Sequence, residues 1–168
     1  MSDLPTAADE ARFWTIIESA WELVGDESAA LRKGLIHREN DDAADTLDKD
    51  LATFLDHLQA LSEPLSSDDL TALDRVLERK LYDLDRADIH EITDGSDDGF
   101  LYCRGFIVAM GQDFYNAVIA DPAVSVVDAE CGKLCYFFAH LHSDRVGSFP
   151  KTNSGISRES FSNPAGWN

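Results

Sequence analysis

Residues 97–120 read DDGFLYCRGFIVAMGQDFYNAVIA, and this stretch decides the fold. Two aspartates open it, Asp121-Pro122 follows it, and the apolar residues between them point in nearly every direction around a helix. A helix that is apolar on all sides is typical of the buried centre of a helical bundle. We therefore predict a central helix over about residues 97–120.

Gly99, Gly105 and Gly111 are spaced six apart on this stretch, and at about 100° per residue they point in three directions. Interior glycines cost up to about 1 kcal/mol each relative to alanine, so their presence needs a reason. We expect them to allow close approach by several neighbouring helices. A ligand cleft lined by backbone is the alternative.

The preceding segments have the spacing of helices that pack around such a centre. Apolar residues recur at three- and four-residue steps over residues 7–24 and again over residues 42–61. A third helix is expected to begin at a cap on Ser66 or Ser67 and to run to about residue 92. Together these segments predict amphipathic helices with solvated acidic faces.

The C-terminal part is less regular. We predict a last helix over about residues 130–144, ended by Gly147. Residues 148–168 are rich in Ser, Asn, Gly and Pro with interspersed aromatics, which indicates an irregular tail pinned by those rings. The expected architecture is one all-α domain over residues 1–147, a bundle of about five or six helices, followed by this tail.

Composition excludes several classes of protein. A chain of 168 residues with 44% hydrophobic residues can bury one core. Its 14 basic and 32 acidic residues give a formal charge of −18, which argues against nucleic-acid binding. No apolar run of about 18 residues and no leader is seen, so we expect no membrane partner and a cytoplasmic location. Three cysteines suit reduced thiols better than disulfides.

A series of short motifs resembles a known family. Ser96-Asp97-Asp98-Gly99-Phe100 is followed by Tyr102, Arg104, Gly105, Ile107 and Gly111. This series is similar to the S-D-D-G-F, Y-F-R-G-W-L-I and Q-G signature of the bacterial family domain of unknown function 4240 (DUF4240). Further segments agree in order: Phe13-Trp14, Leu81-Tyr82-Asp83-Leu84, Ala120-Asp121-Pro122, and Glu130-Cys131 through Leu134 and Tyr136. The resemblance implies a helical bacterial domain and brings no activity with it.

The strongest candidate site is the junction over residues 83–104. Arg104 lies on the all-round apolar helix, so its guanidinium must find a carboxylate or carbonyl partner. One interpretation pairs it with Asp83 or an aspartate of the turn, which would tie two helices together. In the other, Arg104 lines a pocket for a small anion or a peptide carboxylate. The candidate ligand-binding residues are Asp83, Asp97, Asp98 and Arg104.

A calcium loop is suggested by the acidic turn before the central helix but fails on its spacing. Asp94, Ser96 and Asp98 fall at the first, third and fifth places of an EF-hand loop. The twelfth place, which needs a bidentate glutamate, is Gly105. A conventional EF-hand is therefore excluded.

A zinc site is suggested by Cys131, Cys135, His140 and His142. On a helix, the first and last of these residues lie about 16 Å apart, too far to share one ion. We expect the cysteines to act as small core hydrophobes, and we expect no metal and no other cofactor.

The acidity suggests a function of binding rather than catalysis, and we identify no catalytic residues. We expect a non-enzymatic protein-binding or regulatory domain, of the immunity or inhibitor kind, that presents acidic side chains to a basic partner protein. This surface comprises Asp41, Asp42, Asp45, Asp48, Asp50, Asp56, Asp68 and Asp69.

Three alternatives stay open. The aspartates can serve solubility alone. The 22 Asp against 5 Lys can reflect adaptation to salt, although the last 68 residues are nearly neutral. The chain can also be a small metal-assisted hydrolase or nuclease that uses Asp83, Asp97, Asp98 and His90. The oligomeric state cannot be deduced from these patterns.

Overall fold

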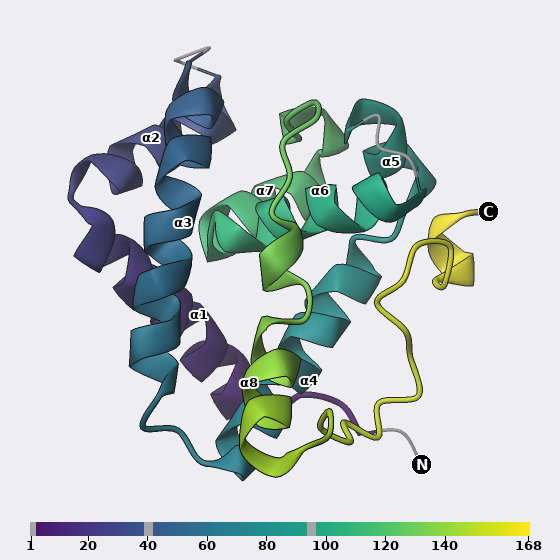
Figure 1. The fold of residues 1–168 in the computed structure, drawn as a ribbon. Coiled ribbons are helices and arrows are strands. Elements are labelled where there is room, and N and C mark those ends of the chain that lie inside the picture. Colours follow the sequence, from purple (N-terminus) through teal and green to yellow (C-terminus); the bar gives the residue numbers. More distant parts are fainter. Residues whose placement is uncertain (1–2, 39–41, 94–96) are drawn as a thin grey trace.

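The computed structural model describes residues 3–38, 42–93 and 97–168, and this part of the chain contains helices and no strand. Eight α-helices and three short 3-10 helices (η) follow one another in it, more than the five or six predicted (Figure 1). They are α1 (Ala7–Val24), α2 (Glu27–His37), α3 (Ala43–Ser62), α4 (Ser67–Asp83), α5 (Ala87–Thr93), α6 (Asp97–Ala109), α7 (Gln112–Ala120), η1 (Pro122–Val124), η2 (Gly132–Leu134), α8 (Phe137–Val146) and η3 (Pro164–Gly166). The predicted all-α class is confirmed.

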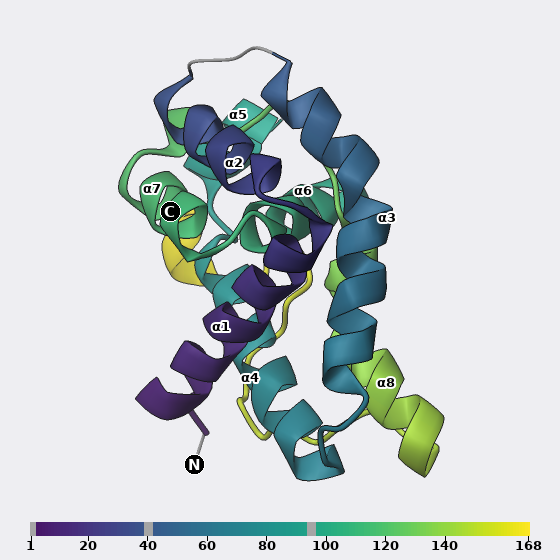
Figure 2. The same ribbon diagram turned by 90° about the vertical axis from the view of Figure 1, so that its left-hand side faces the viewer.

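The longest helices form one group, and α6 lies across it. α1 packs against α3 and α4, and α4 also packs against α8. α6 contacts α4, α7 and η2, and Figures 1 and 2 show it crossing above the middle of the bundle. From Gly99 to Ala109 every α6 residue except Tyr102 is buried. The apolar run on this helix therefore packs on several sides, as its sequence suggests.

Caps and apolar stripes explain where the early helices form. α1 and α3 cover the predicted segments, and Trp21 of α1 stacks on Phe54 of α3 with ring centroids 4.5 Å apart. The Trp21 indole also donates a hydrogen bond of 2.7 Å to the carbonyl of Ala109 at the end of α6. The predicted cap is Ser66, which forms a capping box with Asp69.

The helix predicted over residues 97–120 is two helices, and Gly111 separates α6 from α7. Gly111 has a φ of +101°, which side chains rarely adopt. A Cβ at this position would lie 2.5 Å from Glu18 Oε1 and 2.8 Å from Arg32 Nη1. The backbone at Gly111, where α6 and α7 are separated, therefore lies directly against the ion pair of Glu18 and Arg32, which joins α1 to α2.

The helix predicted from Ser66 to about residue 92 is also two helices. α4 ends at Asp83 and α5 begins at Ala87, because the chain turns around the buried side chain of Asp85. The carboxylate of Asp85 accepts hydrogen bonds from residues 161–163, which belong to the C-terminal tail. A partner far along the chain therefore decides where α4 stops.

Two further boundaries differ from the prediction. The last helix, predicted over residues 130–144, begins only at Phe137, and the shorter η2 precedes it. Gly147 ends α8 in the left-handed conformation, as predicted. α2 was not predicted, because its apolar spacing is interrupted by the buried Arg32 and by Gly34.

The glycines of α6 provide a first test of this packing. A Cβ on Gly105 would lie 2.4 Å from the carbonyl oxygen of Cys131 and 2.7 Å from the Sγ of Cys135, whereas Gly34 in α2 has open space around it. We expect Gly105→Ala to lower the free energy of unfolding by about 2–4 kcal/mol through overpacking, and Gly34→Ala to raise it by about 0.5–1 kcal/mol through helix propensity. Urea unfolding followed by circular dichroism measures both. Equal stability of the two variants would contradict the close contact between α6 and η2.

Candidate functional site

Arg104, the centre of the predicted site, is fully buried and bound to the protein itself. Its Nη1 donates hydrogen bonds of 2.8 Å to the carbonyls of Leu81 and Arg158, and its Nη2 donates to Ser160 Oγ at 3.0 Å. Its Cζ lies 4.7 Å from the ring centroid of Phe100. Burial lowers the pKa of this guanidinium. Carbonyls and a hydroxyl meet the predicted need for polar partners at Nη1 and Nη2, whereas the buried Nε has no hydrogen-bond partner among the described residues.

Neither Asp83 nor His90, the other candidate residues whose side chains the structure describes, binds Arg104. Asp83 forms its ion pair with Arg79 Nε at 3.2 Å, so the pairing of Asp83 with Arg104 was wrong. The side chains of Asp97 and Asp98 lie outside the described residues, as do Asp94 and Ser96. His90 packs against Phe100 at a ring distance of 4.8 Å and against Trp167 at 5.6 Å. The structure therefore offers no exposed surface of Arg104 to a ligand.

A second buried arginine, Arg158, joins the tail to α4. It donates two hydrogen bonds to Asp74, of 3.0 and 2.9 Å, and others to Glu78 and to the carbonyl of Cys135. Burial lowers its pKa, but the charges of Asp74 and Glu78 outweigh this effect and leave the pKa above its ordinary value. Glu78 also accepts hydrogen bonds from Thr152 and Ser154. The tail is thus held to one helix by charge-assisted bonds.

The far end of the tail closes around Asp85. Its carboxylate accepts hydrogen bonds of 2.7–3.0 Å from the backbone amides of residues 161–163 and from the indole of Trp167. Gly166 makes this path possible, because a Cβ there would lie 2.2 Å from the Asp85 carbonyl oxygen. Of the predicted site, Arg104 therefore belongs to a buried network that the tail completes.

The three cysteines are free and buried. Burial raises the pKa of Cys103 to about 11 and those of Cys131 and Cys135 to about 12. The described residues contain no group of three or more His, Cys, Asp and Glu side chains arranged to hold a metal ion. His142 instead lies 2.7 Å from the carbonyl of Ser148.

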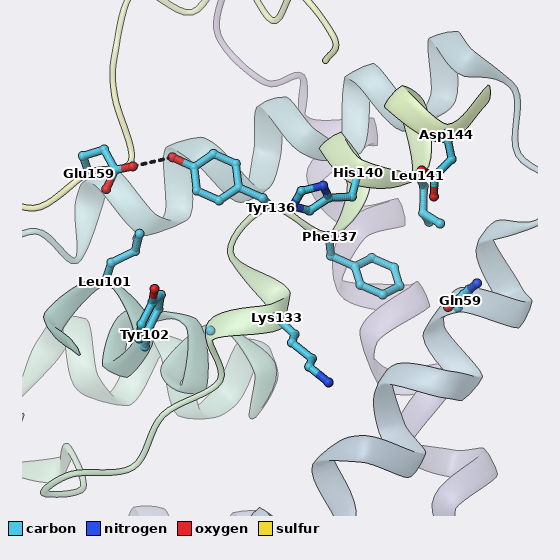
Figure 3. Close-up of a pocket in the computed structure, with 11 residues that line it drawn as sticks. Gln59, Leu101, Tyr102, Lys133, Tyr136, Phe137, His140, Leu141, Asp144 and Glu159 are labelled. Atoms are coloured by element: carbon cyan, nitrogen blue, oxygen red, sulfur yellow. Dashed lines mark hydrogen bonds between the residues drawn. The ribbon is translucent and has the colours of Figure 1, made fainter. Parts of the chain in front are cut away.

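A hollow of the surface, which we call the aromatic cleft, lies between α3, α6, η2 and α8. It has a volume of about 520 Å³. Figure 3 shows the hydroxyl of Tyr136 turned to Glu159, while Phe137 and Lys133 point toward α3. We define the cleft by Gln59, Tyr102, Lys133, Tyr136, Phe137, His140, Asp144 and Glu159. Its size lies within the range of ligand-binding clefts, and its lining is about half polar.

Close packing positions the two tyrosines of the cleft. The Cys131 amide donates to the Tyr102 carbonyl at 2.9 Å, and the ring of Tyr102 leans on Gly132. Tyr136 is held by the guanidinium of Arg158, 4.6 Å from its ring centroid, and its hydroxyl donates to Glu159 at 2.7 Å. The buried network therefore supports one wall of the cleft.

The predicted acidic surface is largely present on α3. Asp45, Asp48 and Asp56 are exposed, and Asp50 is half-buried. These four side chains form no ion pair within the described part of the chain. We call them, together with the exposed Asp42, the acidic face. Of the remaining predicted residues, Asp41 lies outside the described residues, Asp68 is exposed, and Asp69 is engaged by Ser66 and Arg12.

The family model described as protein of unknown function (DUF4240) matches residues 8–131. The chain belongs to the DUF4240 family. No curated protein and no solved structure matches it. No helix in the described residues of this DUF4240 chain has the length and apolar character needed to cross a membrane.

Sequence reasoning missed the buried position of Arg158 and the aromatic cleft. Tyr102 and Tyr136 do appear in the motifs that resemble DUF4240, and both line the cleft. These two tyrosines were the sequence signal for the cleft. However, no spacing pattern predicts that residues 34 apart in the sequence line the same cleft. Arg158 lies in a tail without periodicity, so nothing in the DUF4240 motifs indicates it.

The buried pair gives a second prediction for this DUF4240 domain. Arg158→Met leaves Asp74 and Glu78 without a counter-charge and should lower the free energy of unfolding by about 3–5 kcal/mol. The control Arg79→Met breaks a pair in which both side chains are about one-third exposed, and should cost less than about 1 kcal/mol. Adding Asp74→Asn to Arg158→Met should recover part of the loss. Equal effects of the two arginine variants in urea unfolding would contradict the network.

The thiols give a third prediction. Burial raises the pKa values of the thiols to about 11–12. At pH 8 they should therefore react with Ellman's reagent at least about 100-fold more slowly than unfolded thiols do. Three thiols should react at once in guanidinium chloride. The stability that the thiols contribute is fully present below their unfolded pKa near 9.0 and should fall as the pH rises toward 11–12. Rapid labelling of the native protein would contradict this burial.

Proposed function

We propose that this chain is a non-enzymatic binding or regulatory domain of the immunity or inhibitor kind, which docks a basic segment of a partner protein on the acidic face. The observation that carries the proposal is that most of the chain's own cations bind other acids or backbone carbonyls. The aspartates of α3 therefore have no ion-pair partner among the described residues. The proposal places the domain in the bacterial cytoplasm, which suits three reduced cysteines.

All nine arginines and one of the five lysines contact other parts of the chain. Five of these residues pair with carboxylates near the surface, and five bind buried acids or backbone carbonyls. The first group is Arg12, Arg32, Arg79, Lys80 and Arg86. The second group is Arg38, Arg75, Arg104, Arg145 and Arg158. Among the described residues, Lys33, Lys49, Lys133 and Lys151 are left as exposed cations without such contacts.

The four aspartates of α3 consequently keep nearly all of their charge. Lys49 is the one cation on the same helix, and it forms no ion pair in the described structure. Charges arranged in this way accelerate the encounter with an oppositely charged partner and disfavour acidic ones. The contribution is screened by salt, since the Debye length falls from about 10 Å at 0.1 M to about 3 Å at 1 M.

The proposal is tested with a defined cation, a fluorescein-labelled peptide of eight arginines, by fluorescence anisotropy. The triple variant Asp45→Asn, Asp48→Asn, Asp56→Asn should weaken binding about 10-fold, which corresponds to roughly 0.5 kcal/mol per charge. A matched control, Glu91→Gln, Asp113→Asn, Asp128→Asn, removes three exposed charges outside α3 and should weaken binding about 2-fold or less. Binding to the unaltered chain should be lost at about 0.5 M salt.

Equal weakening by the two triple variants would mean that affinity follows net charge. The acidity would then serve solubility or salt adaptation, and the proposal would be wrong. The hydrolase or anion-binding alternative centred on Asp98 and Arg104 is favoured by no observation, because Arg104 is fully buried.

A further inference from the structure

The aromatic cleft presents ring surface that a cation can approach. Tyr102 is 39% exposed, although its neighbours on α6 are buried. One side of its ring is covered by Gly132, where a Cβ would lie 2.9 Å from Tyr102 Cδ1. Tyrosine rings attract guanidinium and ammonium groups within about 6 Å of the ring centroid. The chain makes this contact itself, since Arg158 packs on the ring of Tyr136.

Two carboxylates line the cleft, Glu159 at the end near Tyr102 and Asp144 at the opposite end (Figure 3). One oxygen of Glu159 accepts the Tyr136 hydroxyl, and the other makes no hydrogen bond within the described residues. Asp144 lines the cleft from α8 and is exposed. Gln59 and Asp56 are three residues apart on α3 and so lie on one side of that helix. The acidic face therefore reaches the edge of the cleft.

We infer that the aromatic cleft receives the side chain of an arginine or lysine from the basic segment of the partner. This inference rests on the proposed function and assigns it a specific pocket. The cation would lie against Tyr102, with Glu159 at the same end of the cleft as its counter-charge (Figure 3), while the rest of the segment follows the acidic face. A volume of about 520 Å³ accommodates such a side chain.

Lys133 allows a test of whether the ligand in the cleft is positively or negatively charged. It is the only lysine or arginine among the residues that line the cleft, it is exposed, and it has no ion pair in the described structure. A bound cation is repelled by Lys133, whereas a bound anion would be held by it. Lys133→Ala should therefore tighten binding of the cationic peptide by about 2-fold, and weaker binding would overturn the inference.

The main experiment compares the binding affinity of the peptide of eight arginines with that of a peptide of eight citrullines. Citrulline has nearly the shape of arginine but is uncharged. Tyr102→Leu should weaken arginine-peptide binding by about 3- to 30-fold, and Glu159→Gln by about 2- to 5-fold. Glu130→Gln removes an exposed charge that does not line the cleft and should change binding by less than about 2-fold. The citrulline peptide should not bind, and thermal unfolding checks that each variant is folded.

The outcomes separate this inference from the proposed function. If the α3 triple variant binds weakly while Tyr102→Leu and Glu159→Gln bind as the unaltered chain does, the acidic face stands and the cleft assignment is wrong. If the cleft variants bind weakly while the α3 variant does not, the cleft assignment stands alone. Equal binding of the arginine and citrulline peptides would overturn the inference, because it would show an affinity that does not depend on a cation. Chemical-shift changes at Tyr102 and Lys133 on titration with the arginine peptide should locate the contact.

Discussion

A buried guanidinium has no water to solvate it, so the chain around it must supply acceptors, and this structure depends on how Arg158 meets that requirement. Its acceptors come from Asp74 and Glu78 on α4 and from the carbonyl of Cys135 just before α8. Arg104 extends the same arrangement from α6, because one of its acceptors is the carbonyl of Arg158. A tail with little regular structure consequently follows one defined path across the bundle.

The same requirement shapes the outer surface. Arginines that satisfy buried carboxylates and helix-end carbonyls are not available to neutralise exposed aspartates, and the chain has few lysines to take their place. Aspartates without an ion pair among the described residues therefore remain on α3, whose apolar stripe faces α1 and whose opposite side faces solvent. The arginines that provide hydrogen bonds to buried acceptors are the same cations that are missing from the acidic face. The aromatic cleft lies between the buried network and the acidic face.

Local patterns predicted the elements that depend on local physics. The stripes of α1 and α3, the Ser66 cap and the Gly147 end of α8 involve residues within one or two helical turns of each other. The helix breaks at Gly111 and Asp85 depend on partners more than 70 residues away. The apolar periodicity therefore predicted one continuous helix at each of these places. The predicted site failed for a similar reason. The chemistry of the Arg104 side chain was inferred correctly as a need for acceptors, but its acceptors lie in segments whose position no spacing encodes.

The contacts of Asp85 and Arg104 with the tail also bear on the order in which the molecule can form. A ribosome releases α4 and α6 well before residues 158–167, and until those residues emerge, a carboxylate and a guanidinium destined for the interior lack their partners. Closing the core earlier would bury both charges unsatisfied, at a cost of several kcal/mol each. Burial of these two groups is therefore unfavourable until the tail is present, which favours an open, hydrated arrangement around them before then.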